Sequence, residues 1–132
     1  MIIDSSAVIA ILRDEPEALV LANAIESATT RRISAANFVE AAAVIDSSRD
    51  PVASRRFDDF FREGRISIEP VTEDQARIAR EAYRDFGKGS GHPAKLNFGD
   101  CFAYALAKDK SAPLLFKGGD FDRTDIEPWK SG

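Results

Sequence analysis

Short apolar segments alternate with longer stretches of helical periodicity along the whole chain. The predicted strands are brief and apolar, and they lie at residues 1–3, 32–35, 66–71 and 113–116. Between them, the spacing of apolar positions predicts helices at residues 7–12, 14–28, 37–47, 51–63, 72–86 and 97–110. Because strands alternate with helices, the pattern predicts an α/β fold with a mostly parallel central sheet of about four to five strands and helices on both faces.

Polar residues mark the expected ends of these elements. Ser5 or Ser6 is expected to cap the first helix, and Thr72 with Gln75 forms a capping box for a later one. The helix that starts near residue 14 is expected to carry Leu19, Ala22 and Ile25 as a stripe at helical spacing. No linker interrupts the pattern, so we expect one domain over residues 1–129 and a short tail at residues 130–132.

Composition and charge exclude several classes of protein. The net charge of −4 argues against a protein that coats nucleic acid through a broad basic face, although it is compatible with a nuclease that gathers acids around a metal. The longest apolar runs are too short to span a membrane, and the first residues lack the features of a signal peptide. The only cysteine, Cys101, excludes an internal disulfide and a cysteine-based zinc site. It is expected to be a small buried residue in a cytoplasmic protein.

Two similar motifs each place an acid at the start of a predicted helix. The first is NFVE, from Asn37 to Glu40, and the second is NFGD, from Asn97 to Asp100. An asparagine followed three residues later by an acid approximates a capping box, so both motifs can serve only to start helices. The same geometry would also aim both acids at one edge of the sheet. The residues alone leave both interpretations open.

Four acids follow strands or open helices at what we expect to be the same edge of the sheet: Asp4, Glu40, Asp100 and Asp120. In parallel sheets, ligands bind beyond the carboxyl ends of the strands. Two carboxylates about 4 Å apart repel by roughly 4 kcal/mol at an effective dielectric near 20, so such a cluster needs protons or a cation. Oxygen ligands without His or Cys select hard cations, so the expected cofactor is Mg²⁺, with Mn²⁺ as a substitute.

The order and spacing of these motifs resemble the PIN domain over nearly the whole chain. The matching segments are the apolar strand ended by Asp4, the SSA that follows it, ANFVE ending at Glu40, NFGD ending at Asp100, and LLFKGGDF around Asp120. More specifically, they resemble VapC-type toxins of VapBC toxin–antitoxin systems. The resemblance implies a Mg²⁺-dependent endoribonuclease that cuts structured RNA, such as tRNA or ribosomal RNA, by metal-activated water. It also implies a small VapB-type antitoxin as partner, a homodimer and toxin–antitoxin hetero-oligomers.

The resemblance assigns roles to individual acids. Asp4, Glu40 and Asp100 match the first three acids of the family, which bind metal and act in catalysis. Asp120 is assigned as the fourth acid, an outer ligand or a ligand of a second ion. Asp122 is the reserve for that place, because this chain has two glycines where many relatives carry an acid.

Other side chains are expected to support these acids. Ser6 matches a small hydroxyl residue of the family that would donate to Asp4. RNA contacts are expected from the basic residues around the acids, which are Lys88, Lys95, Lys117 and Arg123. His92 is expected to be a solvated loop residue and Trp129 a packing residue. The phenylalanines at positions 57, 60 and 61 are expected to be core, with a groove for an antitoxin helix as the alternative.

Three other functions remain open. An aspartyl phosphatase or a receiver domain also places an acid after its first strand, but the phosphatase pattern needs a second aspartate where this chain has Ser6, and the early acidic pair of a receiver is missing. A non-catalytic interaction module on the same fold would use the acids only as helix caps, and calorimetry with Mn²⁺ would separate it from a nuclease. A DNA-directed nuclease would differ from a ribonuclease in its substrate.

Overall fold

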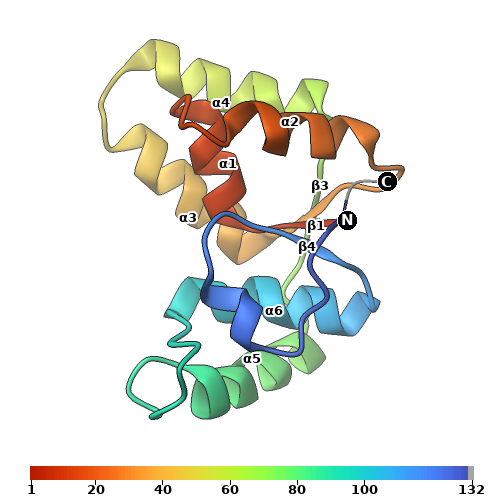
Figure 1. The fold of residues 1–132 in the computed structure, drawn as a ribbon. Coiled ribbons are helices and arrows are strands. Elements are labelled where there is room, and N and C mark those ends of the chain that lie inside the picture. The colour runs from red at the N-terminus through yellow and green to blue at the C-terminus, as the bar shows by residue number, and fades with distance from the viewer. Residues whose placement is uncertain (131–132) are drawn as a thin grey trace.

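A four-stranded parallel sheet forms the centre of the protein, with the strand order β3–β2–β1–β4 (Figure 1). The computed structural model describes residues 1–130, so the last two residues of the predicted tail lie outside the described part of the chain. The strands are β1 (Ile2–Ile3), β2 (Arg32–Ser34), β3 (Ser67–Glu69) and β4 (Leu114–Leu115). Every pair of neighbouring strands is parallel, which confirms the predicted sheet.

Six helices connect or follow the strands, and a short 3-10 helix lies near the C-terminal end. They are α1 (Ser5–Leu12), α2 (Ala18–Ser27), α3 (Ala35–Asp46), α4 (Pro51–Glu63), α5 (Glu73–Phe86), α6 (Phe98–Lys110) and the 3-10 helix η1 (Asp120–Arg123). Within residues 1–130, none of these helices has the length and apolar character needed to cross a bilayer.

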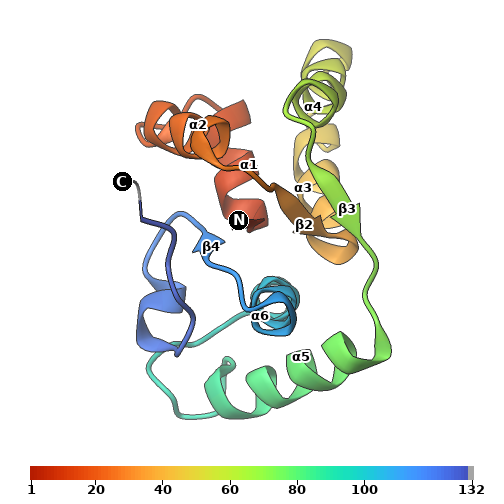
Figure 2. The same ribbon diagram turned by 90° about the vertical axis from the view of Figure 1, so that its right-hand side faces the viewer.

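The helices cover both faces of the sheet, as the pattern predicted. Successive residues of a strand point to opposite faces, and the two residues of β1 show this directly. Ile3 joins the core beneath α1, α2, α3 and α4, whereas Ile2 joins the core beneath α5 and α6. The view in Figure 2 separates these two groups of helices, with the strands between them. Cys101 of α6 is 2% exposed in the second core, which confirms its predicted burial.

The aromatic stripe of α4 is part of the first core. Phe57 and Phe61 are buried, and both rings pack against Phe38 of α3, with centroids 5.4 and 5.0 Å away. Phe60 is partly buried against the same cluster, as is Trp129. The prediction of a core role is therefore confirmed, and the alternative of an open groove at this stripe is wrong for its two buried members.

The first helix begins earlier than expected, with a different cap. Asp4 has an extended backbone, and its carboxylate accepts a hydrogen bond from the backbone N–H of Ser6. Asp4 therefore caps α1, and Ser5 is already its first helical residue. Aspartate accepts from a helix N-terminus as well as serine does. The polar residue that ends β1 thus starts α1 with no intervening loop.

The buried stripe of α2 was predicted only in part. Ile25 is buried as expected, but Leu19 is 72% exposed. The face that packs on the core runs through Leu21, Ala24 and Ile25. Leu19 lies two residues before Leu21, about 200° away around the helix axis, so it faces solvent.

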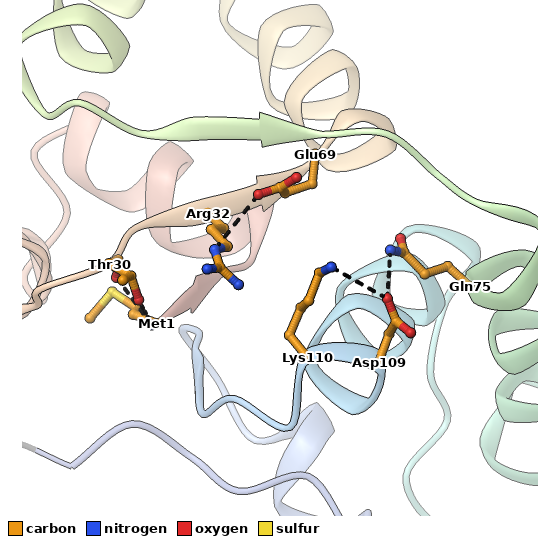
Figure 3. A network of polar contacts seen from close by, with 7 residues as sticks. All are labelled: Met1, Thr30, Arg32, Glu69, Gln75, Asp109 and Lys110. Atoms are coloured by element: carbon orange, nitrogen blue, oxygen red, sulfur yellow. Dashed lines mark hydrogen bonds and ion pairs between the residues drawn. The ribbon is translucent and has the colours of Figure 1, made fainter.

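Polar contacts away from the acid-bearing strand ends hold α5 against α6 and β2 against β3 (Figure 3). The hydroxyl of Thr72 accepts from the backbone N–H of Gln75, as the capping prediction requires. The Gln75 side chain instead donates to Asp109 at the last turn of α6, 3.1 Å away. Arg32 on β2 pairs with Glu69 on β3 at 3.6 Å.

Candidate active site

Asp4 lies at the carboxyl end of β1 and is 2% exposed. Its backbone N–H donates to the Leu115 carbonyl of β4 at 2.9 Å, which fixes it to the sheet. One carboxylate oxygen, Oδ2, accepts from the N–H of Ser6 at 3.0 Å, while the other, Oδ1, is buried without a partner. Burial raises the pKa of Asp4 to about 6, opposed by hydrogen bonds from Ser6 and assisted by the negative charge of Glu40.

Glu40 reaches the same region from the second turn of α3. This helix follows β2 directly, because Ser34 both ends the strand and caps the helix. The Oε1 atom of Glu40 accepts from the Ser5 hydroxyl and from the Asn37 amide, the latter at 3.3 Å. Sequence reasoning missed Ser5 because a hydroxyl next to a strand end was interpreted only as a helix cap.

Asp100 is the third residue of α6 and forms a reciprocal capping box with Asn97. The Asp100 N–H donates to Asn97 Oδ1 at 2.9 Å, and the Asn97 N–H donates to Asp100 Oδ2 at 3.0 Å. Burial raises the pKa of Asp100 to about 7, and the negative charges of Asp4, Asp120 and Glu40 contribute to the increase. Asp100 is therefore a helix cap and a member of the acid group at once.

Asn37 shows that the two NF motifs are not equivalent. Because α3 begins at Ala35, Asn37 lies inside its first turn and is fully buried, so it is not a cap. Its amide nitrogen donates to Glu40 and also to the Gly99 carbonyl of α6, at 2.9 Å. This side chain joins the start of α3 to the start of α6, where two of the acids originate.

The fourth acid lies on η1, which is exposed apart from Phe121. The negative charge of Asp120 contributes to the raised pKa of Asp100. A Cβ on Gly119 would lie 3.7 Å from the Asp122 carboxylate, so Asp122 is turned toward the glycine turn that precedes η1. The charge of Asp120 therefore acts on the acid group, and the choice between Asp120 and Asp122 as fourth acid stays a prediction.

The acids interact electrostatically but do not touch as a ready ligand set. Among the side chains of residues 1–130, no group of three or more His, Cys, Asp or Glu is arranged to hold a metal ion. Mutual repulsion of carboxylates explains the spacing. Three features still fit a hard divalent cation: the donors are all oxygen, Asp4 Oδ1 has no partner, and burial, together with neighbouring negative charge, raises the pKa of Asp4 and Asp100. A bound cation would give Asp4 Oδ1 a partner and would favour the charged forms of Asp4 and Asp100.

The basic side chains around the acids differ in availability. Lys88, Lys95 and Arg123 are exposed. Lys117 forms ion pairs with Glu15 and Glu17, so its charge is largely offset, and its backbone N–H donates to the Ser6 hydroxyl at 3.0 Å.

The loop histidine is less solvated than predicted. His92 is partly buried, and its ring packs edge-on against Phe86 with the centroids 4.8 Å apart. Its Nδ1 accepts from the Ala94 N–H at 3.0 Å. The histidine thus helps to fold the loop between α5 and α6, and both of these contacts are made within that part of the chain.

Comparisons with known proteins find similarity over nearly the whole chain. The sequence profile described as the PIN domain matches residues 1–127. Ribonuclease VapC28 of Mycobacterium tuberculosis is 58% identical over 127 residues, which cover 96% of each chain. The crystal structure of Mycobacterium tuberculosis VapC20, a sarcin–ricin loop cleaving toxin, aligns with a TM-score of 0.76 at 15% identity over 98% of both chains. A toxin–antitoxin complex from Klebsiella pneumoniae gives 0.70 at 16% identity, again over 98% of both. At such identities the two solved structures show the fold alone.

Proposed function

We propose a function for this chain from one established premise: it belongs to the PIN domain family, and its curated relatives are VapC ribonucleases. On that premise the chain is an endoribonuclease of the VapC type, the toxin of a toxin–antitoxin system. Our proposal adds that cleavage depends on Mg²⁺, with Mn²⁺ as a substitute, and that the target is structured RNA such as tRNA or ribosomal RNA. The cut would leave a 5′-phosphate and a 3′-hydroxyl.

One observation carries the metal dependence. Asp4 and Asp100 are buried, burial raises the pKa of both carboxyl groups with a further contribution from the charge of Glu40, and Asp4 Oδ1 lacks any partner. Buried carboxylates need protons or a cation to offset their charge, and a divalent cation would also supply the partner that Oδ1 lacks. The cluster lies at the carboxyl edge of a parallel sheet, where such folds bind ligands.

The acids would have different roles in hydrolysis. Asp4 and Asp100 would hold the ion, and Asp120 would serve as an outer ligand. When bound, Mg²⁺ supplies positive charge that polarises a phosphodiester and makes a nearby water more acidic. Glu40, held by Ser5 and Asn37, would orient the attacking water by accepting its hydrogen bond.

The surroundings of the acids are suited to a phosphate backbone. Exposed Lys88 and Lys95 lie on the loop that leads into α6, and Arg123 lies on η1 beside Asp120. Such contacts position a nucleic acid without reading its sequence. We propose a VapB-type antitoxin as the partner that silences the enzyme, a homodimer as the resting toxin, and the reducing cytoplasm as its location, which the single cysteine favours.

The test uses conservative substitutions of the acids. Asp4→Asn and Asp100→Asn proteins should fail to cut a structured RNA that the wild type cuts with Mg²⁺, and calorimetry should show Mn²⁺ binding to the wild type but to neither of these variants. The matched control is Asp109→Asn, at the opposite end of α6, which should cut normally. Undiminished cutting by both active-site variants would refute the assignment, and equal cutting of single-stranded DNA would favour a general nuclease. Comparing Asp120→Asn with Asp122→Asn identifies the fourth acid.

A further inference from the structure

We infer that Asn37 is a positioning residue, whose carboxamide holds the Glu40 carboxylate against the start of α6 so that Glu40 and Asp100 serve one site. The inference rests on the proposed function for its catalytic consequence. Its structural basis is independent of that function: the Asn37 nitrogen donates to Glu40 Oε1 at 3.3 Å and to the Gly99 carbonyl at 2.9 Å. Asn37 is 0% exposed, so water cannot replace either bond.

The chemistry of the neighbours favours a side chain with two N–H donors here. A carboxylate and a backbone carbonyl are both pure acceptors, so the group between them must supply two N–H donors. An asparagine amide does so, whereas aspartate would place a third set of acceptors against them. The opposite face of the amide, Oδ1, is buried without a partner. Leaving the Oδ1 acceptor buried without a partner lowers the stability of the fold, and the two hydrogen bonds that the amide donates offset this loss.

Two further neighbours fix the Glu40 carboxylate, which stays partly exposed. The Ser5 hydroxyl donates to the same Oε1 from the start of α1. A Cβ at Gly99 would lie 2.1 Å from Glu40 Oε2, so the carboxylate rests directly on the backbone of α6. Segments that start three helices therefore converge on this one group, and Asn37 is the member that touches both Glu40 and the residue before Asp100.

A double-mutant cycle separates positioning from general stabilisation. In the full chain, Asn37→Ala should weaken Mn²⁺ affinity or kcat by about 10- to 100-fold, the usual effect of losing a residue that orients a metal-site carboxylate, with KM for RNA unchanged. In a Glu40→Ala background, the same change should alter kcat and Mn²⁺ affinity by no more than about twofold. An equally large loss in both backgrounds would overturn the proposal, because Asn37 would then act independently of Glu40.

Gln75→Ala is the matched control for loss of a buried amide. Gln75 is 2% exposed and also donates to a carboxylate, Asp109, but at the far end of α6. This variant should lower the Tm while leaving kcat and Mn²⁺ affinity at their wild-type values. If Asn37→Ala behaves in the same way as Gln75→Ala, Asn37 is a stabilising residue only and the proposal fails.

NMR tests the inference without an Asn37 variant, which could misfold, and without requiring that the proposed function is correct. In NMR spectra of the metal-free wild type, the Asn37 side-chain amide protons should exchange slowly and their resonances should shift in Glu40→Ala but not in Asp120→Asn. Rapid exchange, or resonances that ignore Glu40, would overturn the inference. If the wild type neither binds Mn²⁺ nor cuts RNA, but the Asn37 resonances still shift in Glu40→Ala, the proposed function is refuted and the positioning of Glu40 by Asn37 stands.

Discussion

Replacing Gly99 with alanine should disable the acid group while leaving the fold intact. The backbone of Gly99 lies in the first turn of α6, next to the Glu40 side chain. An added Cβ would lie 2.1 Å from Oε2, 2.6 Å from Cδ and 2.7 Å from Oε1 of Glu40. Real Cβ atoms essentially never approach another heavy atom within 3.0 Å, so the whole carboxylate must retreat.

The size of the effect follows from that retreat. Oε2 has to withdraw by about 1 Å, and a misplacement of that size can cost about 100-fold in rate, or roughly 2.7 kcal/mol of transition-state stabilisation. Stability should change little. Alanine stabilises a helix by about 0.5–1 kcal/mol relative to glycine. This gain offsets the loss of one hydrogen bond to the displaced Glu40 carboxylate, which is worth about 1 kcal/mol. We therefore expect the Tm to stay within about 4 °C of the wild type.

The assay is cleavage of a structured RNA with Mg²⁺, alongside a thermal melt of each protein. Gly119→Ala is the control, because its Cβ would meet only the Asp122 carboxylate at an ordinary 3.7 Å. In a Glu40→Ala background, Gly99→Ala should have no further effect on kcat. If Gly99→Ala cuts at the wild-type rate while Glu40→Ala does not, the close packing of Glu40 on α6 has no bearing on catalysis and the reasoning is wrong.

Three further predictions concern charge. In the metal-free protein, the pKa values of Asp4 and Asp100 are raised to about 6 and about 7. The folded state therefore binds more protons than the unfolded state, and the free energy of unfolding should fall as pH rises from about 4 to 7. Asp4 alone accounts for about 3 kcal/mol of this loss, and Mg²⁺ at pH 7 should restore it in urea melts. Asp4→Asn should abolish cleavage yet raise the metal-free Tm at pH 8, and a Tm below that of the wild type would contradict the burial argument. Lys88→Glu and Lys95→Glu should raise KM for RNA and flatten its salt dependence without changing kcat, which titration across salt concentrations would check.

The two NF motifs show which contacts can be predicted from the sequence and which cannot. Asn97 and Asp100 form a capping box that local rules describe completely, since both partners lie within one helical turn. Asn37 follows the same local rule in sequence and breaks it in structure. Ser34, which favours a cap position equally well, starts α3 first, and the Asn37 amide then finds the Gly99 carbonyl of a distant segment. A contact between residues so far apart has no signature in local spacing.

Other misses have the same origin. Ser5 looked like a cap, and its role in holding Glu40 depends on where α3 lies relative to α1. Leu19 has the spacing of a buried residue relative to Ile25, yet the face of α2 that packs on the core runs through Leu21 and leaves Leu19 in solvent. What the sequence did predict well are the features set by short-range chemistry: the apolar strands, the acids at their ends and the parallel order that strand–helix alternation requires.

The direct joining of β2 to α3 limits how this enzyme can diversify. Because no linker separates Ser34 from the helix, one inserted residue before Asn37 would swing Glu40 around the helix axis by about 100° and remove it from the other acids. The long connection between α5 and α6, which carries Lys88 and Lys95, contains none of the acids, and surface connections of this kind tolerate insertions. Relatives that choose different targets should therefore vary the length of that connection and keep the junction at Ser34 free of insertions and deletions.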